Sequence, residues 1–144
     1  MKDVIVKEKT FDQPIDVVWK AISEGAEISR WFIQADFKPE PGYRYTFTAK
    51  EEHGSTVIKG TVLEADPYTL KYTWNVGDAP VETTVIWNLE KMGNQTQLKL
   101  EHTGISKFGG ETAIEMFGHF EKGWNACISG LTNYLLNEDS EPVH

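Results

Sequence analysis

The hydrophobic pattern of the chain changes period near residue 42 and again after Gly110, and these changes limit the possible folds more than any other feature. From about residue 42 to residue 104, apolar side chains recur at every second position, as in the runs 43–47, 70–74, 83–89 and 98–102. Such alternation predicts strands with one buried face. After Gly110 the spacing becomes helical, and the apolar stripe consists of Ile114, Phe117, Phe120, Trp124, Cys127, Ile128, Leu131 and Leu135.

Shorter elements precede and connect these two regions. Residues 3–10 mix valine and isoleucine with charged residues, which suits a partly exposed first strand. Residues 14–32 predict two short helices separated by a break at Gly25. Residues 55–65 also resemble a strand but carry apolar side chains on both faces, which predicts a bulge or bend near Gly60. The long helix is expected to begin at a capping box of Thr112 and Glu115 and to run to roughly Asn137.

The element order predicts an α+β fold, with a curved antiparallel sheet of six or seven strands wrapped around the long C-terminal helix. Two short helices follow the first strand, and residues 1–144 are expected to form a single domain. A curved sheet contacts a straight helix along only part of its length, so side chains or a cavity must fill the remaining space. The side chains facing that space are Tyr45, Phe47, Tyr72, Trp74, Val85, Trp87, Leu98 and Leu100 from the strands, and Phe117, Phe120, Trp124 and Ile128 from the helix.

Charge and cysteine content restrict the partners and the compartment. The 22 acidic residues outnumber the 14 lysines and arginines, which gives a net charge of −8. Such a surface repels phosphate backbones and anionic lipids, so we expect no nucleic-acid partner. No apolar run is long enough for membrane insertion. The single cysteine, Cys127, and the polar N-terminal residues favour a reducing, cytoplasmic location.

Catalytic and cofactor motifs are not recognisable in the sequence. Glycine-rich phosphate loops, paired cysteines and zinc-protease spacings are missing, so no cofactor is expected. Histidines at positions 53, 102, 119 and 144 are too scattered for a metal site. His102 shares the inward face of Leu98 and Leu100. It is therefore either a hydrogen-bonded core residue or a group that orients a ligand or accepts a proton. No catalytic residue is assigned.

Several segments, taken together, resemble a known family. They are PIDVVWKAIS at 14–23, RWF at 30–32, PGYRY at 41–45, GTVLEADPYTLKYTW at 60–74, TQLKLEHTG at 96–104, Gly123 with Trp124, and Leu131 with Tyr134 and Leu135. In this order they resemble the homologues of the heat-shock-protein-90 ATPase activator, a branch of the START-like, birch-pollen-allergen-like superfamily (SRPBCC, helix-grip fold). The resemblance covers nearly the whole chain and implies binding of a hydrophobic, aromatic or lipid-like small molecule.

The expected ligand site lies between the sheet and the C-terminal helix. Its residues are Trp31, Tyr45, Phe47, Tyr72, Trp74, Val85, Trp87, Leu100, His102, Phe117, Phe120, Trp124 and Ile128. Two alternatives stay open. Some relatives are cyclases or hydrolases, and an enzyme of that type would use His102 and a cavity tyrosine. The other alternative is a chaperone-associated co-chaperone or stress-response protein.

One departure from the family bears on the chaperone alternative. The eukaryotic activator has a separate N-terminal domain with a chaperone-binding motif, which has no counterpart in these 144 residues. The sequence is similar to the stand-alone, bacterial members. We therefore expect that this chain alone does not stimulate the chaperone ATPase, because a single domain lacks the avidity of two linked ones.

Overall fold

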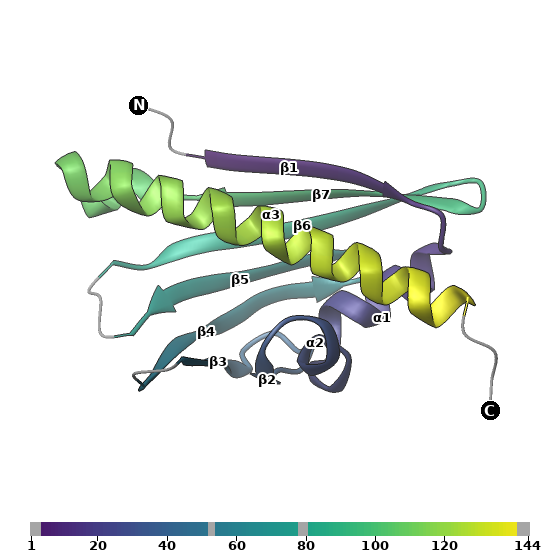
Figure 1. Cartoon of the computed structure of the whole chain (residues 1–144). Helices are drawn as coiled ribbons and strands as arrows, with labels where there is room; N and C mark the ends of the chain where they lie inside the picture. Colours follow the sequence, from purple (N-terminus) through teal and green to yellow (C-terminus); the bar gives the residue numbers. More distant parts are fainter. Residues whose placement is uncertain (1–3, 52–53, 78–80, 141–144) are drawn as a thin grey trace.

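Seven strands form one antiparallel sheet in the computed structural model, which describes residues 4–51, 54–77 and 81–140 (Figure 1). The strands follow the order β1-β7-β6-β5-β4-β3-β2 across the sheet. Their bounds are β1 Val4–Phe11, β2 Gln34–Asp36, β3 Arg44–Glu51, β4 Gly54–Asp66, β5 Thr69–Val76, β6 Thr83–Met92 and β7 Gln95–Thr103. Because all neighbours except β1 and β7 are consecutive in the chain, short connections suffice to build most of the sheet.

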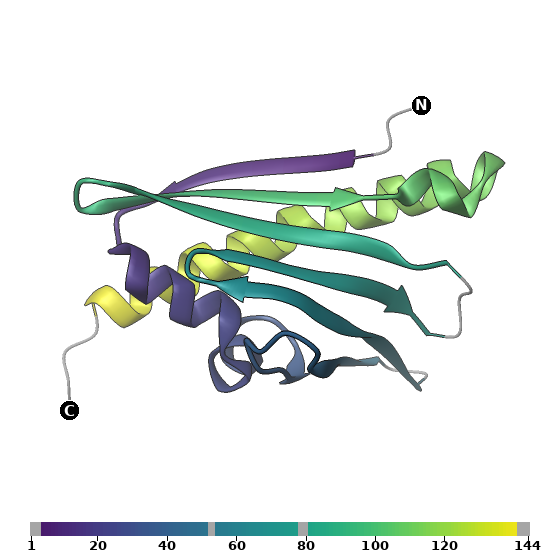
Figure 2. The same cartoon turned by 180° about the vertical axis from the view of Figure 1, so that it is seen from behind.

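The helices lie on one side of this sheet. Their bounds are α1 Ile15–Ser23, α2 Gly25–Trp31, the 3₁₀ turn η1 Ile105–Phe108, and α3 Gly110–Ser140. Seen from behind, the strands β5 to β7 pass in front of α3, so the long helix covers only one face (Figure 2). This arrangement confirms the predicted helix-grip architecture, with the two short helices after the first strand.

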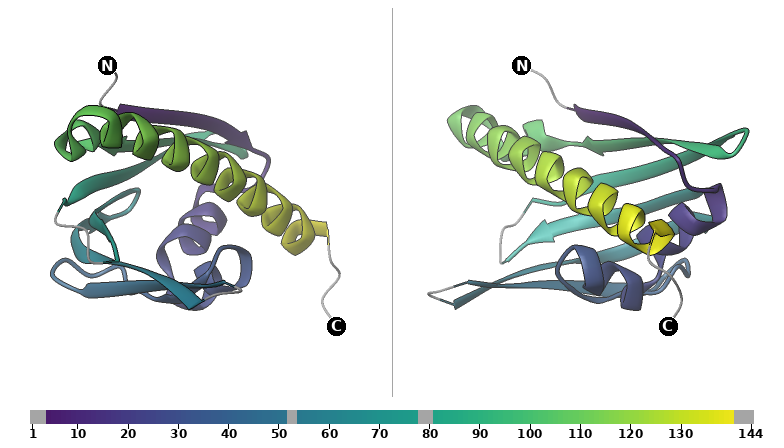
Figure 3. Two further views of the ribbon diagram at one scale, coloured as in Figure 1. Left: turned by 60° about the vertical axis from the view of Figure 1, so that its left-hand side comes forward. Right: turned by 45° about the vertical axis from the view of Figure 1, so that its right-hand side comes forward.

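Curvature of the sheet decides where α3 makes contact. The sheet bends from β1, next to α3, round to β3 and β4 on the opposite side (Figure 3). Helix α3 packs along β1, where Lys7 and Glu121 form an ion pair at 3.9 Å, and against α1 and α2. The inward side chains of the strands are buried, as the alternating burial along β6 illustrates. Between α3 and the strands β3 to β5, side chains alone must bridge the distance.

Three details of the strands and short helices differ from the predictions. Strand β2 was not predicted, because three residues are too short to show any alternation. The bulge in β4 lies at Leu63, between Val62 and Glu64, rather than at Gly60. The chain breaks between the short helices at Glu24, and Gly25 begins α2 instead. A Cβ atom at residue 25 would lie 2.7 Å from the carbonyl oxygen of Phe37, so close packing explains this glycine.

The long helix also differs at its N-terminus. Gly109 and Gly110 have positive φ angles of 76° and 50° and turn the chain directly from η1 into α3. The helix therefore begins at Gly110, and Thr112 lies inside its first turn rather than at a capping box. Ile114 is 62% exposed, because the buried stripe passes through Ala113 instead. At the other end the helix continues to Ser140.

Candidate ligand cavity

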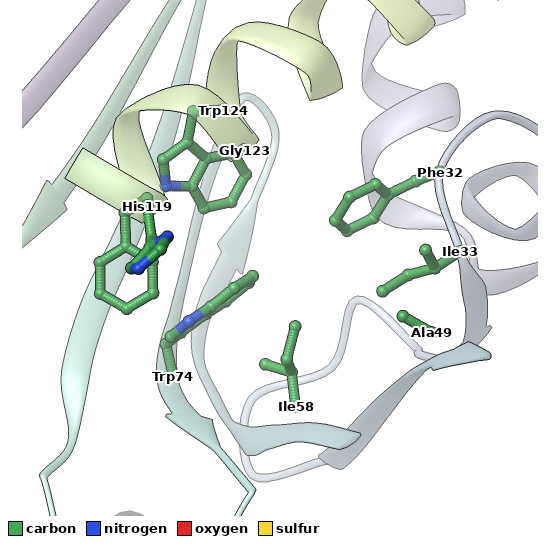
Figure 4. Close-up of a pocket in the computed structure, with 9 residues that line it drawn as sticks. Phe32, Ile33, Ala49, Ile58, Trp74, His119, Gly123 and Trp124 are labelled. Atoms are coloured by element: carbon green, nitrogen blue, oxygen red, sulfur yellow. The ribbon is translucent and has the colours of Figure 1, made fainter. Parts of the chain in front are cut away.

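An apolar cavity of about 210 Å³ lies where α3 and the curved sheet separate (Figure 4). Strands β3, β4 and β5 supply one wall, the turn after α2 supplies a second, and the middle of α3 closes the third. The lining residues are Phe32, Ile33, Ala49, Ile58, Trp74, His119, Phe120, Gly123 and Trp124. Figure 4 shows the indole of Trp74 extending into the space enclosed by Ile58, Phe32 and Trp124.

Nearly all side-chain atoms of this wall are carbon. The polar exceptions are the indole nitrogens of Trp74 and Trp124 and the imidazole of His119, which is exposed on α3. The indole N–H of Trp124 is engaged, because it donates to Nδ1 of His102 at 2.9 Å. The buried indole nitrogen of Trp74, by contrast, has no hydrogen-bond partner within the described part of the chain. A buried donor without an acceptor is costly, and few native groups are left in this state.

Deeper in the fold, next to this cavity, the aromatic core is almost solid. A void of only about 10 Å³ lies among Ile22, Ile28, Trp31, Phe32, Phe47, Tyr72, Trp87, Trp124 and Cys127. That volume is at the lower limit for a single water molecule. The polar atoms here pair with each other: Trp87 Nε1 donates to Tyr72 Oη at 2.9 Å, and Trp31 Nε1 donates to the Ala21 carbonyl at 2.8 Å. Burial raises the pKa of Tyr72 and of Cys127 and keeps both neutral.

His102 is fully buried behind the cavity wall, and both of its ring nitrogens are hydrogen-bonded. Trp124 can only donate, so Nδ1 of His102 must be the unprotonated nitrogen. The proton therefore resides on Nε2, which lies 2.6 Å from Oγ1 of Thr83 and donates to it. Burial lowers the pKa of His102 to about 3, so the ring is neutral at physiological pH. Its contact with Trp124 fixes the orientation of that indole.

The structure divides the thirteen predicted site residues into three groups. Trp74, Phe120 and Trp124 line the cavity. Trp31, Phe47, Tyr72 and Trp87 lie around the deep void. The others line neither space: Tyr45, Val85, Leu100 and His102 are buried elsewhere in the core, and Phe117 and Ile128 are only partly buried.

Six lining residues were not predicted. Ala49 lies on the same inward face as Tyr45 and Phe47, so extending the alternation by two residues would have predicted it. Ile58 lies in the strand with apolar residues on both faces, where parity alone is ambiguous. His119 and Gly123 lie one turn apart on α3 beside Phe120 and were not marked by hydrophobicity. Phe32 and Ile33 occupy the turn after α2. Hydrophobic periodicity does not predict where the side chain of a turn residue points.

The described residues contain neither a metal-binding cluster nor a membrane-spanning helix. No group of three or more His, Cys, Asp or Glu side chains is close enough there to bind a metal ion. His53 and His144 lie outside the described ranges. Within those ranges, no helix combines the length and the apolar character needed to span a bilayer.

Solved structures with the same fold cover most of the chain. Protein MLL2253 from Mesorhizobium loti has a TM-score of 0.81 and 26% identity, over 97% of this chain and 99% of that one. The AHSA1 (SPO3351) protein from Silicibacter pomeroyi has a TM-score of 0.80 and 21% identity, over 94% and 99%. CalU16 from Micromonospora echinospora has a TM-score of 0.75 and 24% identity, over 94% and 77%. The last two likenesses concern the fold alone.

Family comparison agrees with the resemblance found in the sequence. No curated protein matches the chain. The model of the family described as "Activator of Hsp90 ATPase homolog 1-like protein" matches residues 12–136, which include every residue that lines the cavity. The chain therefore belongs to the family of activator of Hsp90 ATPase homolog 1-like proteins.

Proposed function

We propose that this protein binds a small hydrophobic molecule in the cavity between α3 and strands β3 to β5. The observation that carries the proposal is the cavity itself, whose wall is almost entirely carbon and holds two indole rings. Ligand sites are typically apolar concavities with few polar groups. The N–H of Trp74 is buried at this wall without a partner, so a bound molecule that shifts the indole and offers a hydrogen-bond acceptor would satisfy it.

The cavity volume restricts the size of the ligand. An engineered protein cavity of about 150 Å³ accommodates benzene, so a volume of about 210 Å³ suits one or two fused rings. Burying roughly 300 Å² of apolar ligand surface contributes about 7–8 kcal/mol before ordering costs. Micromolar affinity requires about 8 kcal/mol. Stacking on Trp74 and Trp124, at about 0.5–1.5 kcal/mol per ring pair, and one hydrogen bond can supply the remainder.

The geometry favours binding over the alternatives. A cyclase or hydrolase would need His102 and a tyrosine at the cavity. His102 instead has both nitrogens occupied, and neither Tyr45 nor Tyr72 lines the cavity. For a chaperone adaptor we would expect one broad apolar surface. The large exposed apolar side chains are instead distributed over β1, α1, β4, β6 and α3 (Val4, Val6, Val17, Leu63, Met92, Ile114 and Leu136).

The proposal is tested by titrating the protein with naphthalene and with quinoline, which has the same two fused rings plus one acceptor nitrogen. We expect micromolar binding of both, with quinoline tighter by up to about tenfold, the worth of one net hydrogen bond. In NMR spectra the indole N–H signal of Trp74 should shift with quinoline. The Trp87 signal serves as an internal control, because its N–H is already bonded to Tyr72.

A cavity-filling variant completes this experiment. Ala49 lines the cavity, and Ala49→Phe should occupy it and abolish binding of both compounds. Binding should also persist at high salt, because no charge pairing is involved. Undiminished binding to Ala49→Phe, or the lack of any shift at cavity residues, would contradict the proposal.

A further inference from the structure

Gly123 is the lining residue whose identity the fold itself does not explain. It lies in the interior of α3, where glycine is among the least favourable residues. Its φ angle lies outside the positive range that favours glycine, and a Cβ atom built on it meets nothing within 4 Å. Neither backbone conformation nor packing requires a glycine here.

Two other glycines of α3 provide a comparison within the same helix. At Gly130 a Cβ atom would lie 3.1 Å from the carbonyl oxygen of Trp31, so tight packing against α2 accounts for that residue. At Gly118 a Cβ atom would meet nothing within 4 Å, as at Gly123. Both glycines are exposed, but Gly123 lines the cavity and Gly118 does not. The two positions thus differ mainly in whether the open space belongs to the cavity.

From these observations we infer that Gly123 determines the size of the molecule that the cavity accepts. This inference rests on the proposed function. The missing side chain leaves the helix backbone bare beside Trp124, opposite Trp74 and Ile58 (Figure 4). The second ring of a two-ring ligand lies in this space, against the α carbon of Gly123. A methyl group at this position removes that room but leaves enough for a single ring.

The test compares two pairs of variants, Gly123→Ala with Gly118→Ala and Gly123→Leu with Gly118→Leu, using naphthalene and benzene as probes. One excess methylene in a hydrophobic pocket changes selectivity by about 10- to 200-fold. We expect Gly123→Ala to bind naphthalene at least about tenfold more weakly and benzene with unchanged affinity. Gly123→Leu should bind neither. Both Gly118 variants should bind both probes like the original protein.

Thermal unfolding shows whether the variants are folded. Both alanine variants should have a higher Tm than the original protein, because alanine is the better helix residue. Gly123→Ala with undiminished naphthalene affinity, while Ala49→Phe still abolishes binding, would overturn the inference and leave the proposed function intact. If the original protein binds neither naphthalene nor benzene, the proposed function fails and this inference with it.

Discussion

Replacing Gly60 by alanine is expected to destabilise the protein by about 2–6 kcal/mol, although alanine is normally the better residue within a strand. The cause is the close approach of β5 to β4. A Cβ atom at residue 60 would lie 2.1 Å from the carbonyl oxygen of Thr73 and 2.7 Å from its Oγ1. Backbone atoms cannot rotate away as the end of a side chain can, so the two strands would have to separate.

Thr73 also holds neighbouring groups in place, which increases the cost. Its carbonyl accepts a hydrogen bond from Tyr45 Oη at 2.6 Å, and its Oγ1 accepts one from the Thr61 amide at 2.8 Å. Overpacking typically costs about 1–3 kcal/mol, and each lost hydrogen bond adds about 0.5–1.5 kcal/mol. Urea unfolding measures the sum.

Gly118→Ala is the matched control for this experiment. Position 118 has open space and lies on a helix, so alanine should stabilise the protein there by about 0.5–1 kcal/mol. The same substitution is therefore expected to have opposite signs at the two positions. A stabilising effect of Gly60→Ala would show that β4 and β5 do not approach as closely as the structure places them.

Strand β4 shows which features of the fold the sequence predicts and which it does not. Apolar residues on both faces of 55–65 correctly indicated that β4 cannot be regular. They could not locate the bulge, because its position at Leu63 is a property of the register between β4 and β5. A single strand carries no information about its partner's register. Local alternation therefore predicts that a strand contains a bulge more reliably than it predicts which residue forms it.

The candidate site shows a related limit. Periodicity assigned Trp74, Trp87 and His102 to the interior, and all three are buried. Of these, only Trp74 lines the cavity. The difference depends on where α3 crosses the sheet, which its contacts with β1, α1 and α2 determine. A period of two residues identifies the face of a strand but not the distance to the element above it. Inward residues that fill the core and those that line a space therefore look alike in the sequence.

Acidification from pH 6.5 to pH 4 is expected to lower the free energy of unfolding through His102 by about 3 kcal/mol. Burial lowers the pKa of His102 to about 3 in the folded protein, against about 6.5 in the unfolded chain. Between these values the unfolded chain binds the additional proton, so stability rises with pH at up to about 1.4 kcal/mol per pH unit. The contribution is complete above about pH 6.5 and is lost progressively towards pH 3.

The hydrogen bonds of His102 explain why protonation is unfavourable. A second proton on the ring would sit on Nδ1 and face the N–H of Trp124, so that two donors would meet at 2.9 Å. His102→Gln tests this, because glutamine retains one acceptor and one donor but does not titrate. The difference in unfolding free energy between the two proteins, measured from pH 4 to pH 7, isolates His102 from the carboxylates that titrate in the same range.

His119→Gln is the control for that measurement, since it makes the same replacement at an exposed position of α3. At neutral pH, His102→Phe should lower the free energy of unfolding more than His102→Gln does. It leaves the Trp124 N–H without an acceptor, at a cost of about 1–3 kcal/mol. It should also weaken naphthalene binding, since a Trp124 indole without its partner no longer holds one wall of the cavity in place. An equal pH dependence in His102→Gln and the original protein would mean that His102 is not the neutral, doubly bonded imidazole described above.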